Sequence, residues 1–116
     1  MNNWTEEELA FRCERLSVRM SKLAQNFLQM AVLSVDVSNV EAVLAIIRES
    51  KGFLELTALD LDVDQGFELA QMQRQLSRWH IHWSEIWADD FGRLEISSLA
   101  QTWANFIQRW QEFWFN

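Results

Sequence analysis

The chain has 116 residues, a formal net charge of −7 and 49% apolar residues, with seven tryptophans, eight phenylalanines and no tyrosine or proline. This length and composition are typical of one folded domain with a single hydrophobic core, and they exclude a disordered chain. The acidic charge argues against binding to nucleic acid. No apolar run approaches the ~20 residues that a membrane span needs.

The compartment can be inferred from the N-terminus and from cysteine usage. Residues 1–8 lack the basic and apolar regions of a secretory signal peptide. Cys13 is the only cysteine, so no intrachain disulfide can form. We therefore expect a protein of the cytoplasm.

A first helix is predicted from about residue 6 to residue 33. Thr5 and Glu8 have the spacing of a capping box, which marks a helix N-terminus. From Leu9 onward, apolar residues recur at steps of three and four, which is the spacing of one helical face. Cys13 falls on this face and is predicted to be buried as a small hydrophobic side chain.

A second helix is predicted over about residues 39–61. Ser38 and Glu41 have the spacing of another capping box. Gly52 is expected to weaken or kink the helix, since glycine costs ~1 kcal/mol relative to alanine in a helix interior. Residues 59–64 alternate as a strand would, but a lone strand has no partner here, so we favour the helix.

A third helix is predicted over about residues 64–88, with Asp62 or Asp64 as its N-cap. One seam of this helix carries six large apolar side chains at steps of three and four: Leu69, Met72, Leu76, Trp79, Trp83 and Ile86. Residues 89–92 should stop it, with Gly92 in the left-handed conformation. The fourth predicted helix, about 96–115, holds the same spacing without a break.

The helices have similar lengths and are joined by three short connections. Short connections force neighbouring helices to run antiparallel. The sequence therefore predicts an all-α, single-domain, up-down-up-down four-helix bundle.

Polar residues offer one candidate for metal or acid–base chemistry. His82, Glu85 and Asp89 stand at positions i, i+3 and i+7, on one face of the predicted third helix. Three such side chains could hold a divalent metal in a metal-dependent enzyme. A solvated polar stripe of the same residues is far commoner and is the interpretation we prefer. No other enzyme motif is present, so we expect neither an enzyme nor a bound cofactor.

The tryptophans admit two interpretations. In the first, Trp79, Trp83, Trp103 and Trp110 fill the core between the third and fourth helices. In the second, these bulky side chains leave a gap for a flat apolar ligand, such as haem or a tetrapyrrole, with His80 as a haem ligand. The first interpretation is favoured because tryptophans at seam positions are usually core.

Some apolar residues are left over once the seams are assigned. They lie beside or opposite the predicted core faces: Phe11, Val18, Ile81, Trp87, Trp114 and Phe115. Clustered exposed aromatic residues are often contact surfaces. The sequence therefore predicts a protein–protein interaction or regulatory module that binds a protein partner or forms a homodimer through this surface. The alternative is that the assigned seam is off by one position and some of these residues are core.

Overall fold

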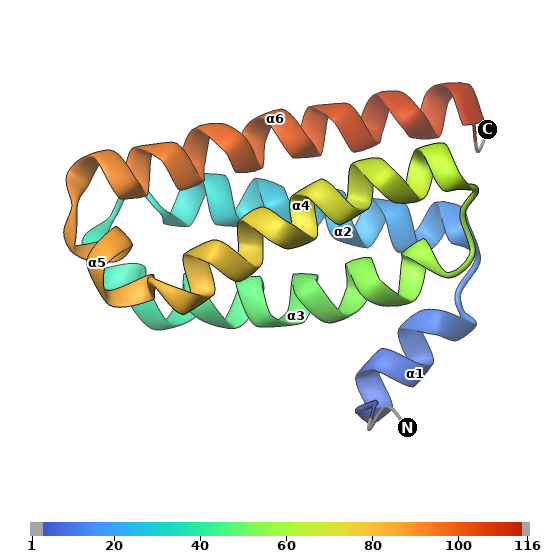
Figure 1. The fold of residues 1–116 in the computed structure, drawn as a ribbon, viewed down its shortest axis with the longest axis horizontal. Coiled ribbons are helices and arrows are strands. Elements are labelled where there is room, and N and C mark those ends of the chain that lie inside the picture. Colours follow the sequence, from blue (N-terminus) through green and yellow to red (C-terminus); the bar gives the residue numbers. More distant parts are fainter. Residues whose placement is uncertain (1–3, 115–116) are drawn as a thin grey trace.

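The computed structural model describes residues 4–114, with side chains up to residue 112. Four long helices alternate in direction along the molecule (Figure 1): α2 (Leu16–Leu33), α3 (Val40–Ala58), α4 (Val63–Ile81) and α6 (Asp90–Trp114). Three short elements complete the fold: α1 (Glu6–Cys13), the 3-10 helix Val37–Asn39 and α5 (Trp83–Ala88). The predicted all-α class is confirmed, since residues 4–114 contain no strand.

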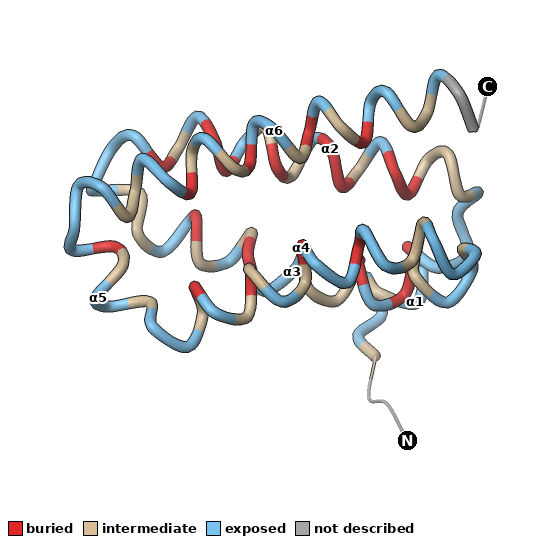
Figure 2. The backbone as a smooth tube through the Cα atoms, turned by 45° about the horizontal axis from the view of Figure 1, so that its top comes forward, coloured by how far each residue is buried: buried red, intermediate tan, exposed pale blue. Residues whose placement is uncertain are grey.

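The core lies between the long helices, where their apolar faces meet (Figure 2). α2 packs along α6 and also along α3, and α3 packs along α4. The fully buried large side chains include Trp79, Phe11, Phe27, Met20, Leu23, Met30, Ile47, Leu54, Leu56, Leu69, Leu76, Ile96 and Ile107. No helix among the described residues is both long enough and apolar enough to cross a bilayer.

The predicted first helix is two helices in the structure. Thr5 and Glu8 form the predicted capping box at the start of α1. The chain then becomes extended at Glu14 and Arg15, and α1 leaves the line of α2 (Figure 1). Cys13 is exposed, so its predicted burial is wrong. The reason is that packing against α3, rather than continuation of the α2 seam, decides which face of α1 is buried.

One prediction for the second helix, its N-cap, is also wrong. α3 runs through Gly52 without a break, and the missing side chain lets Glu8 of α1 lie against the backbone there; that Gly52 weakens the helix stays a prediction. Ser38 does not cap α3. Instead, Asp36 accepts hydrogen bonds from the backbone N–H and the hydroxyl of Ser38, at 2.9 and 2.8 Å, and caps the 3-10 helix. These bonds lower the pKa of Asp36.

The predicted third helix divides at His82 into α4 and α5. Asp62 caps α4 as expected, by accepting from the backbone N–H of Gln65 at 2.8 Å. α6 begins at Asp90, six residues earlier than predicted, because Asp89 accepts from the N–H of Phe91. Gly92 is therefore helical and not left-handed.

Candidate binding groove

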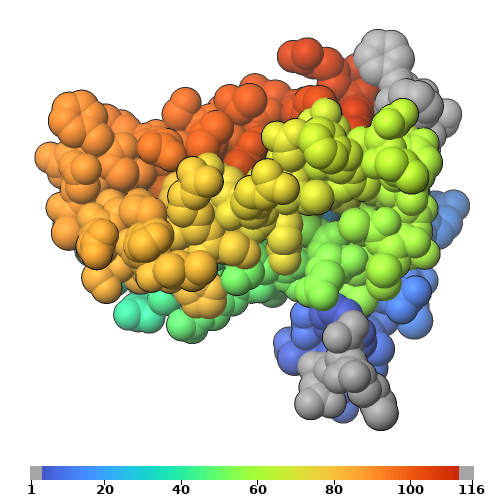
Figure 3. Space-filling model, in the orientation of Figure 1, coloured from blue at the N-terminus to red at the C-terminus, as the bar shows by residue number. Residues whose placement is uncertain are grey.

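α4 and α6 do not pack closely along their length, although both pack on the rest of the fold. In the view of Figure 1, the ribbon of α4 runs close to that of α6 where α6 finishes and separates from it toward α5. Figure 3 shows the same face, with α4 in yellow and α6 in orange and red. The divergence leaves a groove made of two adjoining hollows, of about 460 and 330 Å³, which share Gln75.

The floor of this α4–α6 groove is apolar. Met72 and Trp79 of α4 are buried beneath it, and Leu99, Trp103 and Phe106 of α6 are half-buried along it. Half-buried aromatic side chains expose part of their apolar surface to water. Burial of that surface by a partner would contribute favourably to the free energy of binding.

The two tryptophans of the floor pack on each other. The ring centroids of Trp79 and Trp103 are 5.4 Å apart, with 35° between the ring planes. Phe27 of α2 meets Trp103 edge-on, at 5.2 Å. Because the floor is anchored to α2 in this way, it is a fixed surface rather than a set of loose side chains.

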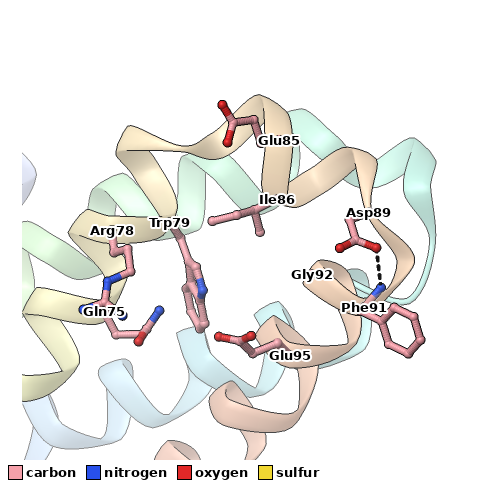
Figure 4. Close-up of a pocket in the computed structure, with 9 residues that line it drawn as sticks. All are labelled: Gln75, Arg78, Trp79, Glu85, Ile86, Asp89, Phe91, Gly92 and Glu95. Carbon is pink, nitrogen blue, oxygen red and sulfur yellow. Dashed lines mark hydrogen bonds between the residues drawn. The ribbon is translucent and has the colours of Figure 1, made fainter.

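The wide end of the groove is rimmed by charged side chains (Figure 4). The carboxylate of Glu95 points across the groove toward Trp79 and Gln75, while Ile86 points into it from α5. Four carboxylates line the groove over its whole length, together with a single positive charge: Glu68, Glu85, Asp89, Glu95 and Arg78. Among the described residues, none of these five side chains forms an ion pair.

The proposed site for a flat ligand is only partly assembled. Trp79 and Trp103 come together, but a planar ligand between them would need their rings roughly 7 Å apart. Trp83 stacks on Trp87 of α5, with centroids 5.0 Å apart. Trp110 packs against Phe106, at 4.9 Å.

His80 faces α3 and does not line the groove. Its Nδ1 lies 3.3 Å from the Nζ of Lys51. Burial lowers the pKa of His80, and the positive charges of Lys51 and Arg48 lower it further. His80 is therefore a neutral acceptor for Lys51, which differs from the haem ligand considered from sequence.

The candidate metal residues His82, Glu85 and Asp89 do not share one helical face, because the helix breaks at His82. All three are exposed. Glu85 and Asp89 line the wide end of the groove, whereas His82 does not. In the described part of the chain, no three His, Cys, Asp or Glu side chains are grouped so that they could hold a metal ion.

The surface predicted for protein contact is wrong at two of its aromatic positions. Phe11 is buried and stacks on Phe53 of α3, with ring centroids 3.8 Å apart. Trp87 is buried, and its indole N–H donates to the carbonyl oxygen of Val37 at 2.9 Å. Phe11 therefore joins α1 to α3, and Trp87 joins α5 to the 3-10 helix Val37–Asn39. Both residues are part of the core, as the alternative interpretation of the seam anticipated.

The other residues of that predicted surface are scattered. Val18 is half-buried and Ile81 is exposed at the end of α4. The side chain of Trp114 and the whole of Phe115 lie outside the described residues.

Sequence reasoning missed the groove because its floor residues carry the same spacing as core residues. Leu99 and Phe106 stand at seam positions, and no local signal says that α4 will not cover them. It also missed the exposed Phe91 and Leu94, which belong to the first turns of α6 rather than to a loop.

No family model, curated protein or solved structure matches this chain. The function is therefore argued from the groove itself.

Proposed function

We propose that this protein is a protein–protein interaction module of the cytoplasm, built as an up-down-up-down four-helix bundle, and that the α4–α6 groove binds an amphipathic helix of a partner protein. Cytoplasmic location is supported by the single, exposed Cys13. One observation carries the proposal: an apolar floor of half-buried aromatic residues lies in a groove that no helix of the described chain covers.

The groove is long enough to hold a helix. On α6 its lining runs from Phe91 to Phe106, which at 1.5 Å per residue is a length of roughly 22 Å. A helix of about 15 residues would lie along it. The lining residues recur every three or four positions on both walls, so each turn of a docked helix would meet side chains from α4 and from α6.

A designed peptide tests this proposal. The probe is a neutral amphipathic peptide of about 15 residues, with leucine on one face and glutamine on the other. We expect it to shift the backbone NMR signals of the residues that line the groove, and to change the fluorescence of Trp103. Shifts confined to other surfaces, or no binding at millimolar peptide, would show that the groove is not a helix-binding site.

A matched pair of variants on α6 supplies the control. Leu99→Gln removes apolar area from the groove floor and is expected to weaken peptide binding about tenfold. Leu94→Gln makes the same change on the same helix at an exposed position outside the groove, and it should leave binding unchanged. Equal effects of the two variants would contradict the proposal.

Self-association is a second candidate function, and a surface that adjoins the groove at Phe91 supports it. Val35, in the turn after α2, and Leu94, near the start of α6, line one hollow and are both exposed. Val32 in the last turn of α2 and Phe91 in the first turn of α6 are exposed as well. An apolar surface shared by two helices is suited to a two-fold symmetric dimer.

Sedimentation equilibrium tests this second candidate. We expect the wild-type chain to dimerise at micromolar concentration and the Val35→Glu, Leu94→Glu double variant to be a monomer. A monomeric wild-type chain would exclude self-association and would leave the groove proposal unaffected.

A further inference from the structure

We propose that the partner helix bound in the α4–α6 groove is basic on its polar face, an inference that rests on the proposed function. The observation that supports this inference is the negative charge of the side chains that line the groove. Four carboxylates and one guanidinium line it, and the whole chain carries a net charge of −7. Electrostatic complementarity sets both the encounter rate and the choice between partners.

The negative charges are concentrated where the groove is widest. Glu85 of α5, Asp89 of the α5–α6 turn and Glu95 of α6 all line this end (Figure 4). None of them is neutralised by an ion pair within residues 4–112. Lysine or arginine at one end of a docked helix would therefore meet three carboxylates that form no ion pair with a described residue, which fixes the direction of the helix in the groove as well as its charge.

Arg78 limits where the positive charges of the partner can lie. It stands on the α4 wall of the wide end, beside Gln75 and Trp79 (Figure 4). A basic side chain on that side would be repelled, whereas one turned toward α5 and α6 would be attracted. The charge pattern therefore selects a helix whose basic residues follow one edge of its apolar face.

The narrow end of the groove supplies the apolar part of the contact. Leu99, Trp103 and Phe106 line it with only one carboxylate, that of Glu68. Apolar residues of the partner would be buried there, while charges at the wide end set orientation and specificity. A helix from a second copy of this acidic chain is a poor occupant of the groove, since the four carboxylates that line it favour a basic helix.

Three probes of identical leucine face, with lysine, glutamine or glutamate on the polar face, test the inference. At about 50 mM salt we expect the lysine peptide to bind at least about tenfold more tightly than the glutamine peptide. The glutamate peptide should bind weakest. The advantage of lysine should shrink at about 300 mM salt, because salt screens exposed charges.

Two triple variants of equal net charge locate the effect. Glu85→Gln, Asp89→Asn, Glu95→Gln neutralises the wide end, and asparagine at 89 keeps an oxygen that can accept from the N–H of Phe91. It should abolish the preference for lysine. Glu41→Gln, Glu55→Gln, Glu112→Gln removes three exposed carboxylates that do not line the groove, and it should retain most of the preference.

The outcomes separate this inference from the function on which it rests. If the glutamine peptide binds the groove and lysine gives no advantage, the charge inference is wrong and the helix-binding function stands. If none of the peptides binds the groove, both are wrong. Concentration-dependent shifts of the groove residues without peptide would identify a second copy as the occupant and would overturn the basic partner.

Discussion

Arg19 of α2 forms an ion pair with Asp60, which follows the end of α3, at 2.8 Å between Nη1 and Oδ2. The side chain of Arg19 is only 6% exposed, whereas that of Asp60 is 39% exposed. Within residues 4–112, the Nε of Arg19 has no hydrogen-bond partner. A buried guanidinium thus depends on one half-exposed carboxylate, which joins the start of α2 to the turn between α3 and α4.

We expect Asp60→Ala to destabilise the fold by about 2 kcal/mol, because it leaves the buried charge of Arg19 without a partner. Arg19→Met removes that charge and fills similar space, so it should cost less than Asp60→Ala. Urea denaturation measures both. The exposed pair of Lys22 and Glu14, at 3.5 Å, is the control, and Glu14→Ala should change stability by less than about 0.5 kcal/mol. Equal costs for the buried and exposed pairs would contradict this account.

The two tryptophans of α5 provide a matched test of one hydrogen bond. Trp87 donates its indole N–H to Val37, whereas the buried indole N–H of Trp83 has no partner among the described side chains and backbone. Trp87→Phe should destabilise the protein by about 1 kcal/mol more than Trp83→Phe does, since only the first leaves a carbonyl unpaired. Thermal and urea unfolding report the difference. A larger cost at Trp83 would show that ring volume, not hydrogen bonding, dominates in α5.

Local chemistry explains the parts of the fold that could be predicted from sequence. The caps at Thr5 and Asp62 were predictable because each side chain accepts from an N–H only three residues away. The burial of Leu69, Met72, Leu76 and Trp79 follows from helical spacing alone.

The remaining features depend on contacts between distant segments. Phe11 was placed off the core face because nothing near it shows that α1 will pack on Phe53 of α3. The groove could not be predicted from sequence for the same reason. Leu99 and Phe106 line an open groove only because α4 diverges from α6. This divergence involves the break at His82 and the tertiary packing of α5.

The glycines of α4 and α6 should respond oppositely to the same substitution. A Cβ on Gly92 would collide with the backbone carbonyl of Ile86, so Gly92→Ala must push α5 and α6 apart. We expect a cost of about 2 kcal/mol. A Cβ on Gly66 of α4 would make only an ordinary van der Waals contact, 3.9 Å from the carbonyl oxygen of Ala58, and Gly66→Ala should stabilise the protein by roughly 0.5–1 kcal/mol. Melting temperatures of the two variants test this, and a stabilising Gly92→Ala would show that the turn tolerates a side chain.

Stability should fall in mildly acidic solution because of His80. Burial, then Lys51 and Arg48, lower the pKa of His80 below its ordinary value of 6.5. In the window between that value and the lowered one, the unfolded chain binds more protons than the folded chain. The stabilisation from neutral His80 is therefore complete above pH 6.5 and is lost as the pH falls through the folded pKa. Urea denaturation across this range should show a steeper loss for the wild type than for His80→Gln. In an NMR titration, Lys51→Met should raise the pKa of His80, and a wild-type His80 that titrates at or above 6.5 would contradict the prediction.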